Sequence, residues 1–80
     1  MSALDGKTIA ILATHGFEQS ELEVPRDRLA EAGATVHVVS PESGEITGWE
    51  GDGWGRAIPV DRALADANAA DYDALVLPGG

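Results

Sequence analysis

The 80-residue sequence contains no cysteine, and its five basic side chains are outnumbered by fourteen acidic ones, which gives a formal net charge of −9. The absence of cysteine excludes disulfides, thiolate metal sites and a thiol nucleophile within these residues. The excess of carboxylates repels phosphate backbones and anionic lipid headgroups. We therefore expect neither nucleic acid nor a membrane surface as a partner.

Long apolar runs are also absent. No segment approaches the roughly 18 apolar residues that span a bilayer. The start of the chain, Met1 to Lys7, lacks both the basic residues and the apolar stretch of a signal peptide. These absences predict a soluble, cytoplasmic protein.

The glycine-rich phosphate-binding loops are missing as well. Gly16 is the only glycine from Thr8 to Ala32, so neither a dinucleotide fingerprint nor a P-loop is present there. Glu18, Glu21 and Glu23 stand where a pyrophosphate would lie and would repel it. No serine occupies a nucleophile elbow, and no acidic or histidine group has compelling metal spacing. We predict no cofactor and no metal.

Three short apolar runs are present, and they are rich in Ile and Val. They cover residues 8–13, 35–40 and 73–77, and their near-continuous hydrophobicity is typical of strands buried on both faces of a parallel sheet. A helical stretch from about Glu18 to Ala32 connects the first two runs. The right-handed crossover rule then predicts an α/β fold in which the first run lies between the second and the third.

Two further elements are predicted between the second and third runs. Residues 62–68 suggest a short helix with Asp61 as its N-cap. Residues 41–59 are rich in glycine, and within them 45–47 and 57–58 are expected to pair as a hairpin. Trp49 and Trp54 in this segment either lie flat on the sheet in a surface connection or form a lid or subunit contact.

The last run is followed by Pro78 to Gly80, which should lie at the carboxyl edge of the sheet, where open α/β sheets bind their ligands. The turn from Thr14 to Phe17 should lie beside it. A chain that stops after a central strand would leave a pairing edge or face uncovered. We therefore expect residues 1–80 to be the N-terminal portion of a larger α/β domain.

Glu21 lies in the acidic start of the predicted helix, which contains Pro25. One interpretation is that these acids are solvated and simply favour the helix N-terminus. The other is that Glu21 projects toward the strand ends, close to residues 79–80, as an acid that shares its proton with a nucleophile. The second interpretation predicts that Glu21 is more buried than Glu18 or Glu23.

The two histidines are less informative. His15, in the loop after the first run, could be a base, a ligand or an exposed loop residue. His37 lies within a predicted strand and is expected to be an interior histidine with a hydrogen-bond partner.

Several segments together resemble the first half of the ThiJ/PfpI family, which comprises intracellular-protease-like proteins, glyoxalases, protein deglycases and stress chaperones. The combination of Phe-Glu-x-x-Glu-x-x-x-Pro with a strand ending in Leu-Pro-Gly-Gly carries most of the resemblance. The similar segments are residues 7–13, 16–25, 29–33, 46–48 and 72–80.

The resemblance implies a flavodoxin-like parallel-sheet sandwich of the class I glutamine amidotransferase type, of which only the first half is present. It also implies a cysteine nucleophile on a later strand-to-helix elbow. In such proteins the glutamate that matches Glu21 is hydrogen-bonded to the thiol, and the backbone around the glycine that matches Gly80 helps to form the oxyanion pocket. This sequence stops before the cysteine.

Three functions compete at this stage. The resemblance implies a stress-related cysteine-dependent hydrolase, glyoxalase or deglycase that acts on a small aldehyde, a glycated protein or a peptide, and that forms a homo-oligomer. A second possibility is a non-enzymatic chaperone or interaction protein on the same fold. A third is a complete small α/β binding module. The sequence alone does not choose among protease, deglycase and glyoxalase.

Overall fold

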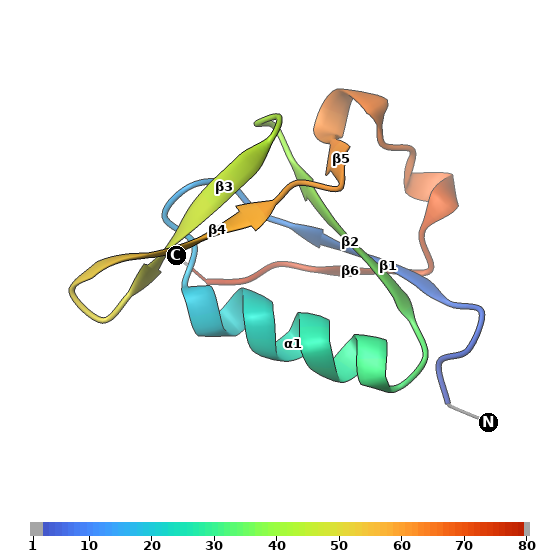
Figure 1. Ribbon diagram of the computed structural model, residues 1–80. Helices are drawn as coiled ribbons and strands as arrows, with labels where there is room; N and C mark the ends of the chain where they lie inside the picture. Colours follow the sequence, from blue (N-terminus) through green and yellow to red (C-terminus); the bar gives the residue numbers. More distant parts are fainter. Residues whose placement is uncertain (1–2, 80) are drawn as a thin grey trace.

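The computed structural model of the chain describes residues 3–79, which form a parallel sheet, one α-helix that packs on it, and a separate two-stranded hairpin (Figure 1). In chain order the elements are β1 (Thr8–Leu12), α1 (Gln19–Glu31), β2 (Thr35–Ser40), β3 (Glu45–Glu50), β4 (Gly53–Pro59), β5 (Arg62–Ala63), the 3-10 helices η1 (Leu64–Asp66) and η2 (Ala69–Asp71), and β6 (Ala74–Val76).

The sheet has the strand order β5-β2-β1-β6, and every neighbouring pair in it is parallel. The predicted arrangement, with the first apolar run between the second and the third, is therefore confirmed. Ile11 of β1 lies opposite Val38 of β2 and Val76 of β6. Because side chains alternate along a strand, this register places the three on one face of the sheet.

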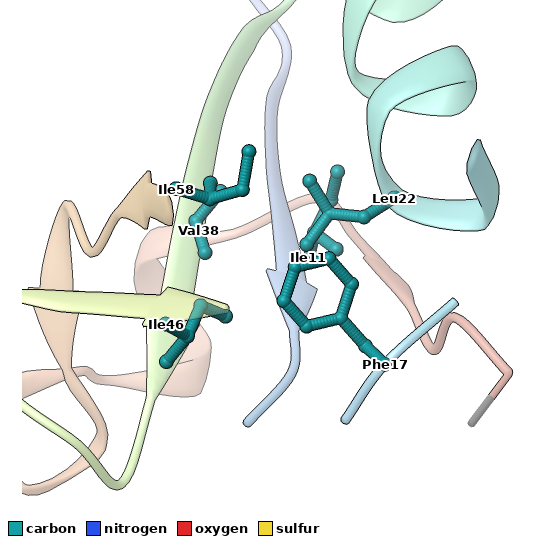
Figure 2. Packing of buried hydrophobic residues seen from close by; sticks show 6 residues of the cluster. All are labelled: Ile11, Phe17, Leu22, Val38, Ile46 and Ile58. Atoms are coloured by element: carbon teal, nitrogen blue, oxygen red, sulfur yellow. The ribbon is translucent and has the colours of Figure 1, made fainter. Parts of the chain in front are cut away.

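That face carries the core, which α1 and the hairpin cover together. Figure 2 shows side chains from β1, β2, α1 and the hairpin pointing toward one another. Each member of the cluster is at most 4% exposed, and burial of a large apolar side chain contributes about 1.5 to 3 kcal/mol to stability. The members are Ile11, Phe17, Leu22, Val38, Ile46 and Ile58.

The opposite face of the sheet is apolar but open. An apolar hollow of about 300 Å³ lies over this face, between the sheet and the η1–η2 segment. Leu75 of β6 is 59% exposed there, so the described residues leave much of it open to solvent. The hollow is lined by Ala10, Leu12, Val39, Leu64, Ala67, Asn68, Ala69, Tyr72 and Leu75.

The predicted helix over residues 62–68 is wrong. Residues 62 and 63 form β5 beside β2, and only single 3-10 turns follow. Asp61 is not an N-cap, because its carboxylate accepts a hydrogen bond from the backbone N–H of Val38 (2.7 Å) while its own N–H donates to the Val38 carbonyl (2.8 Å). This two-way pairing draws the chain into an extended conformation at the point where a helix would have to begin.

The predicted hairpin is confirmed, and it is longer than expected. β3 and β4 pair antiparallel, with Ile46 opposite Ile58 and with an irregularity between Thr47 and Trp49. The two tryptophans lie opposite each other in the hairpin, and their rings pack edge to face against each other. A role for them in a lid or subunit contact stays a prediction.

No helix within residues 3–79 is long and apolar enough to cross a membrane. α1 begins after Glu18 and continues through Pro25 to its last residue, Glu31. It is amphipathic, because Leu22 is fully buried against the sheet while Val24, Glu21, Asp27 and Glu31 are exposed.

Candidate functional site

The end of β6 meets the first turn of α1 at the carboxyl edge of the sheet. The backbone N–H of Gly79 donates to Oε1 of Glu21 (2.9 Å), and the backbone N–H of Glu18 donates to the Gly79 carbonyl (2.7 Å). Two segments almost sixty residues apart in the sequence are thus joined by a pair of hydrogen bonds. The expected proximity of Glu21 to the glycines that follow the last strand is confirmed for Gly79.

Gly79 allows this close approach because it has no side chain. A β-carbon at this position would lie 2.6 Å from Oε1 of Glu21 and 3.2 Å from its Cδ. Both distances are shorter than ordinary van der Waals contact, so any other residue would push the carboxylate away. The second glycine, Gly80, lies outside the described residues.

Glu21 itself is exposed, whereas Glu18 and Glu23 are half-buried. The expectation that Glu21 is the most buried of the three is therefore wrong. The physical reason is that its only described partner is glycine backbone, which covers little of a carboxylate. Its backbone carbonyl also has no helical donor, since the residue four positions later is Pro25. A catalytic role for Glu21 and for Gly80 stays a prediction.

His15 lies in the exposed loop after β1, and its Nδ1 accepts a hydrogen bond from the backbone N–H of Thr47 (3.1 Å). An accepting Nδ1 carries no proton, so the ring proton of the neutral imidazole is on Nε2. His37 is half-buried, and its Nδ1 lies 3.0 Å from the Tyr72 hydroxyl, so the expected hydrogen-bond partner is confirmed. Among residues 3–79 no group of His, Asp and Glu side chains could hold a metal ion.

Gln19 is a buried polar residue that the sequence did not reveal. It is 3% exposed, and its Oε1 accepts the backbone N–H of Arg56 in β4 (2.7 Å). Its Nε2 donates to the carboxylates of Glu50 (3.0 Å) and Glu23 (3.3 Å). The side chain thereby attaches the hairpin to the first turn of α1, the turn that also carries Glu21.

Arg56 adds an ion pair to this attachment. Its guanidinium lies 2.9 Å from Oε1 of Glu23, and the hydrogen bond and the charge of that carboxylate raise the pKa of Arg56. The arginine side chain is mostly exposed, so the pair contributes little to stability. Its effect is to neutralise the only basic side chain of the hairpin.

A further pair of backbone hydrogen bonds fixes the hairpin relative to Gly79. The N–H of Trp49 donates to the Phe17 carbonyl (2.6 Å), while the next residue, Glu18, donates to Gly79. The adjacent residues Phe17 and Glu18 therefore bind Trp49 of the hairpin and Gly79 after β6, respectively.

Comparison with known proteins supplies the family. Residues 7–80 match the sequence model of the DJ-1/PfpI family. The chain is 40% identical over 75 residues to YraA of Bacillus subtilis (strain 168), a protein provisionally named a cysteine protease, and the match covers 92% of this chain and 42% of that protein. It is 42% identical over 72 residues to the deglycase PfpI of Pyrococcus furiosus, with 90% of this chain and 41% of that protein covered.

A solved structure gives the same result. The fold matches a two-domain protein of Anabaena variabilis that contains DJ-1/ThiJ/PfpI-like and ferritin-like domains, with a TM-score of 0.81 and 31% identity over 92% of this chain and 21% of that one. The chain spans about two fifths of the length of the curated relatives named above. The resemblance drawn from the sequence is thus confirmed, and the chain belongs to the DJ-1/PfpI family.

Proposed function

We propose that this chain is the N-terminal portion of a single DJ-1/PfpI-type domain whose full-length protein is a cysteine-dependent hydrolase of the deglycase type. The observation that carries the proposal is the hydrogen bond from the Gly79 N–H to Glu21 Oε1 at the carboxyl edge of the sheet. This edge is where open α/β sheets place their reacting groups.

The open face of the sheet supports the assignment to one portion of a domain. Leu75 and Leu77 are 59% and 67% exposed, and an apolar hollow of about 300 Å³ lies over the same sheet. Exposed apolar surface of this kind favours a covering partner. In the proposal the remaining part of the full-length domain packs on this face and supplies the nucleophilic cysteine.

In this arrangement Glu21 is the acid partner of the thiol. Its Oε1 accepts the Gly79 N–H, while among residues 3–79 no donor contacts Oε2. Oε2 is therefore free to share a proton with a cysteine sulfur brought to the edge, and a hydrogen bond from a carboxyl group stabilises a thiolate. The backbone N–H groups near Gly80 would receive the charge that develops on the substrate carbonyl oxygen.

The substrate class we propose is an aldehyde adduct on a protein side chain. The name of the Pyrococcus furiosus relative, a deglycase, supports this class, and the provisional protease name of YraA supports a thiol nucleophile. In the proposed reaction the thiolate attacks the carbon that carries the nitrogen, so a C–S bond forms as the C–N bond breaks, and the released amine or guanidine takes a proton. A hydrogen shift converts the resulting hemithioacetal into a thioester, and one water molecule hydrolyses it to a 2-hydroxy acid and the free thiol. A stress-related role, a cytoplasmic location, a homo-oligomeric state and activity as a glyoxalase toward free aldehydes belong to the same proposal.

The test uses the full-length protein and an arginine derivative that has been treated with methylglyoxal. The proposal predicts that the protein restores the free guanidine, as measured by mass spectrometry, and that prior alkylation with iodoacetamide abolishes this restoration. An unchanged adduct after incubation with protein would contradict the proposal and would favour the non-enzymatic chaperone or interaction protein. The Glu21→Leu variant is expected to restore little guanidine, whereas a Glu31→Leu variant should act like the wild type.

A further inference from the structure

The hairpin carries a shallow depression that the proposed chemistry does not use. It encloses about 370 Å³ and is lined by His15, Thr47 and Trp54. The hydrogen bond from the Thr47 N–H to His15 Nδ1 forms its polar wall, and the Trp54 indole forms its apolar wall. The depression is thus built by the hairpin and by the loop that follows β1.

The Trp54 indole at this depression remains available to a ligand, and Trp49 packs against it. Trp54 is 64% exposed and Trp49 is 36% exposed, which is unusual for two large aromatic side chains. Their ring centroids are 5.3 Å apart and their planes meet at 80°, an edge-to-face arrangement. In such an arrangement the edge of one ring meets a face of the other, and the 64% exposure of Trp54 leaves much of its indole open to solvent.

The pair is also held in place before any ligand arrives. Gln19 binds the hairpin backbone at Arg56 and the carboxylate of Glu50, and the Trp49 N–H donates to the Phe17 carbonyl. Preorganised side chains lose less conformational freedom on binding, which favours affinity. The same contacts hold the hairpin beside the Glu21–Gly79 hydrogen bond.

The negative charge around the two tryptophans favours a cationic ligand. The chain has a net charge of −9, and the hairpin contributes the carboxylates of Glu45, Glu50 and Asp52. Its single arginine, Arg56, is already neutralised by Glu23. A negative potential attracts cations and repels anions, and indole is the best aromatic face for a guanidinium or ammonium group.

We propose that Trp54, supported by Trp49, forms a subsite that binds a positively charged arginine or lysine side chain of a peptide or protein substrate. The identity of the ligand as a substrate rests on the proposed function, because the reacting edge lies on the neighbouring segment. The subsite holds a basic residue close to the one that carries the adduct, and it thereby directs the enzyme to basic segments of proteins.

The test is isothermal titration calorimetry of the full-length protein with acetyl-Gly-Arg-Gly-amide and with the same peptide containing citrulline. Citrulline has the shape of arginine without its charge, so wild-type protein should bind the arginine peptide more tightly, and the difference should shrink as salt concentration rises. In the Trp54→Leu variant the arginine peptide should bind about two- to five-fold more weakly, which is the range for a solvent-exposed cation–π contact. Trp54→Phe keeps an aromatic face and should lose less affinity than Trp54→Leu.

The outcomes separate the subsite from the proposed chemistry. Glu31→Leu, a change at the exposed far end of α1, should leave the peptide affinity unchanged. Equal affinity of wild-type protein for the arginine and citrulline peptides would overturn the subsite. This comparison does not depend on whether a variant folds. Equal affinities of Trp54→Leu and Trp54→Phe, in proteins with matching circular dichroism spectra, would overturn it as well. A failure of adduct removal with intact arginine binding would refute the proposed function alone.

Discussion

Replacement of Gly55 by alanine should destabilise the attachment of the hairpin to α1. A β-carbon at Gly55 would overlap Oε1 of Gln19 and would lie only 2.6 Å from its Cδ. Gln19 is 3% exposed, so its side chain has little room in which to retreat. The alanine methyl would therefore displace the amide from its partners.

The size of the effect follows from the hydrogen bonds that the displacement breaks. Gln19 Oε1 would lose the Arg56 N–H (2.7 Å), and Nε2 would lose the Glu50 carboxylate (3.0 Å). A buried polar group without a partner costs about 1 to 3 kcal/mol. Alanine lowers the entropy of the unfolded chain, which offsets about 0.4 to 1 kcal/mol of this loss. We expect a net loss of about 1 to 2 kcal/mol in the free energy of unfolding.

Gly53 supplies the matched control, because it lies in the same strand and a β-carbon there meets nothing within 4 Å. Gly53→Ala should be neutral or slightly stabilising. Urea unfolding of the full-length variants, followed by circular dichroism, should separate the two midpoints while the slope of the transition stays constant. In a Gln19→Ala background the clash disappears, so Gly55→Ala should cost almost nothing. Equal midpoints for the two glycine variants in the wild-type background would refute the reasoning.

Two further substitutions test other contacts. Asp61→Ala should lower the free energy of unfolding by about 1 to 3 kcal/mol, because it leaves the N–H of Val38, a residue that is 2% exposed, without its partner. Asp71→Ala is the control, because this exposed carboxylate has no partner within residues 3–79, and it should change the urea midpoint little. Equal midpoints for Asp61→Ala and Asp71→Ala would contradict the role assigned to Asp61. Gly79→Ala should push the Glu21 carboxylate out of its present position and reduce adduct removal by the full-length protein, whereas retention of full activity would show that the close approach is not needed.

The sheet and the hairpin were predictable because both leave a regular pattern in the sequence. Three short apolar runs predicted the parallel strands and their order, and glycine-rich spacing predicted the antiparallel pair. The helix predicted over residues 62–68 is absent because the apolar pattern of a helix is weak in that segment. Leu64 is its only large apolar residue, and the Asp61 carboxylate binds a neighbouring strand instead of capping a helix. Tertiary contacts therefore override the local propensity of this alanine-rich segment.

The candidate site was predictable only in part. The contact between Glu21 and the glycines after the last strand follows from the topology, since both lie at the carboxyl edge. The burial of Glu21 does not follow from the topology, because it depends on which other residues cover the carboxyl edge of the sheet. The role of Gln19 was not predictable, because its partners in the hairpin lie more than thirty residues away and a single long-range polar contact leaves no periodic pattern in a sequence.

The most direct test of the central claim is the alkylation rate of the proposed cysteine nucleophile of the full-length protein at neutral pH, measured by mass spectrometry with iodoacetamide. Glu21→Leu removes the carboxyl group at nearly constant volume, and Glu31→Leu makes the same change at the exposed far end of α1. Glu23 is a poor control, since it binds both Arg56 and Gln19. A hydrogen bond to a charged group contributes about 1.5 to 3 kcal/mol, so Glu21→Leu should slow alkylation by about 10- to 100-fold while Glu31→Leu reacts like the wild type. Equal rates in all three proteins would contradict the assignment of Glu21 as the acid partner of the thiol.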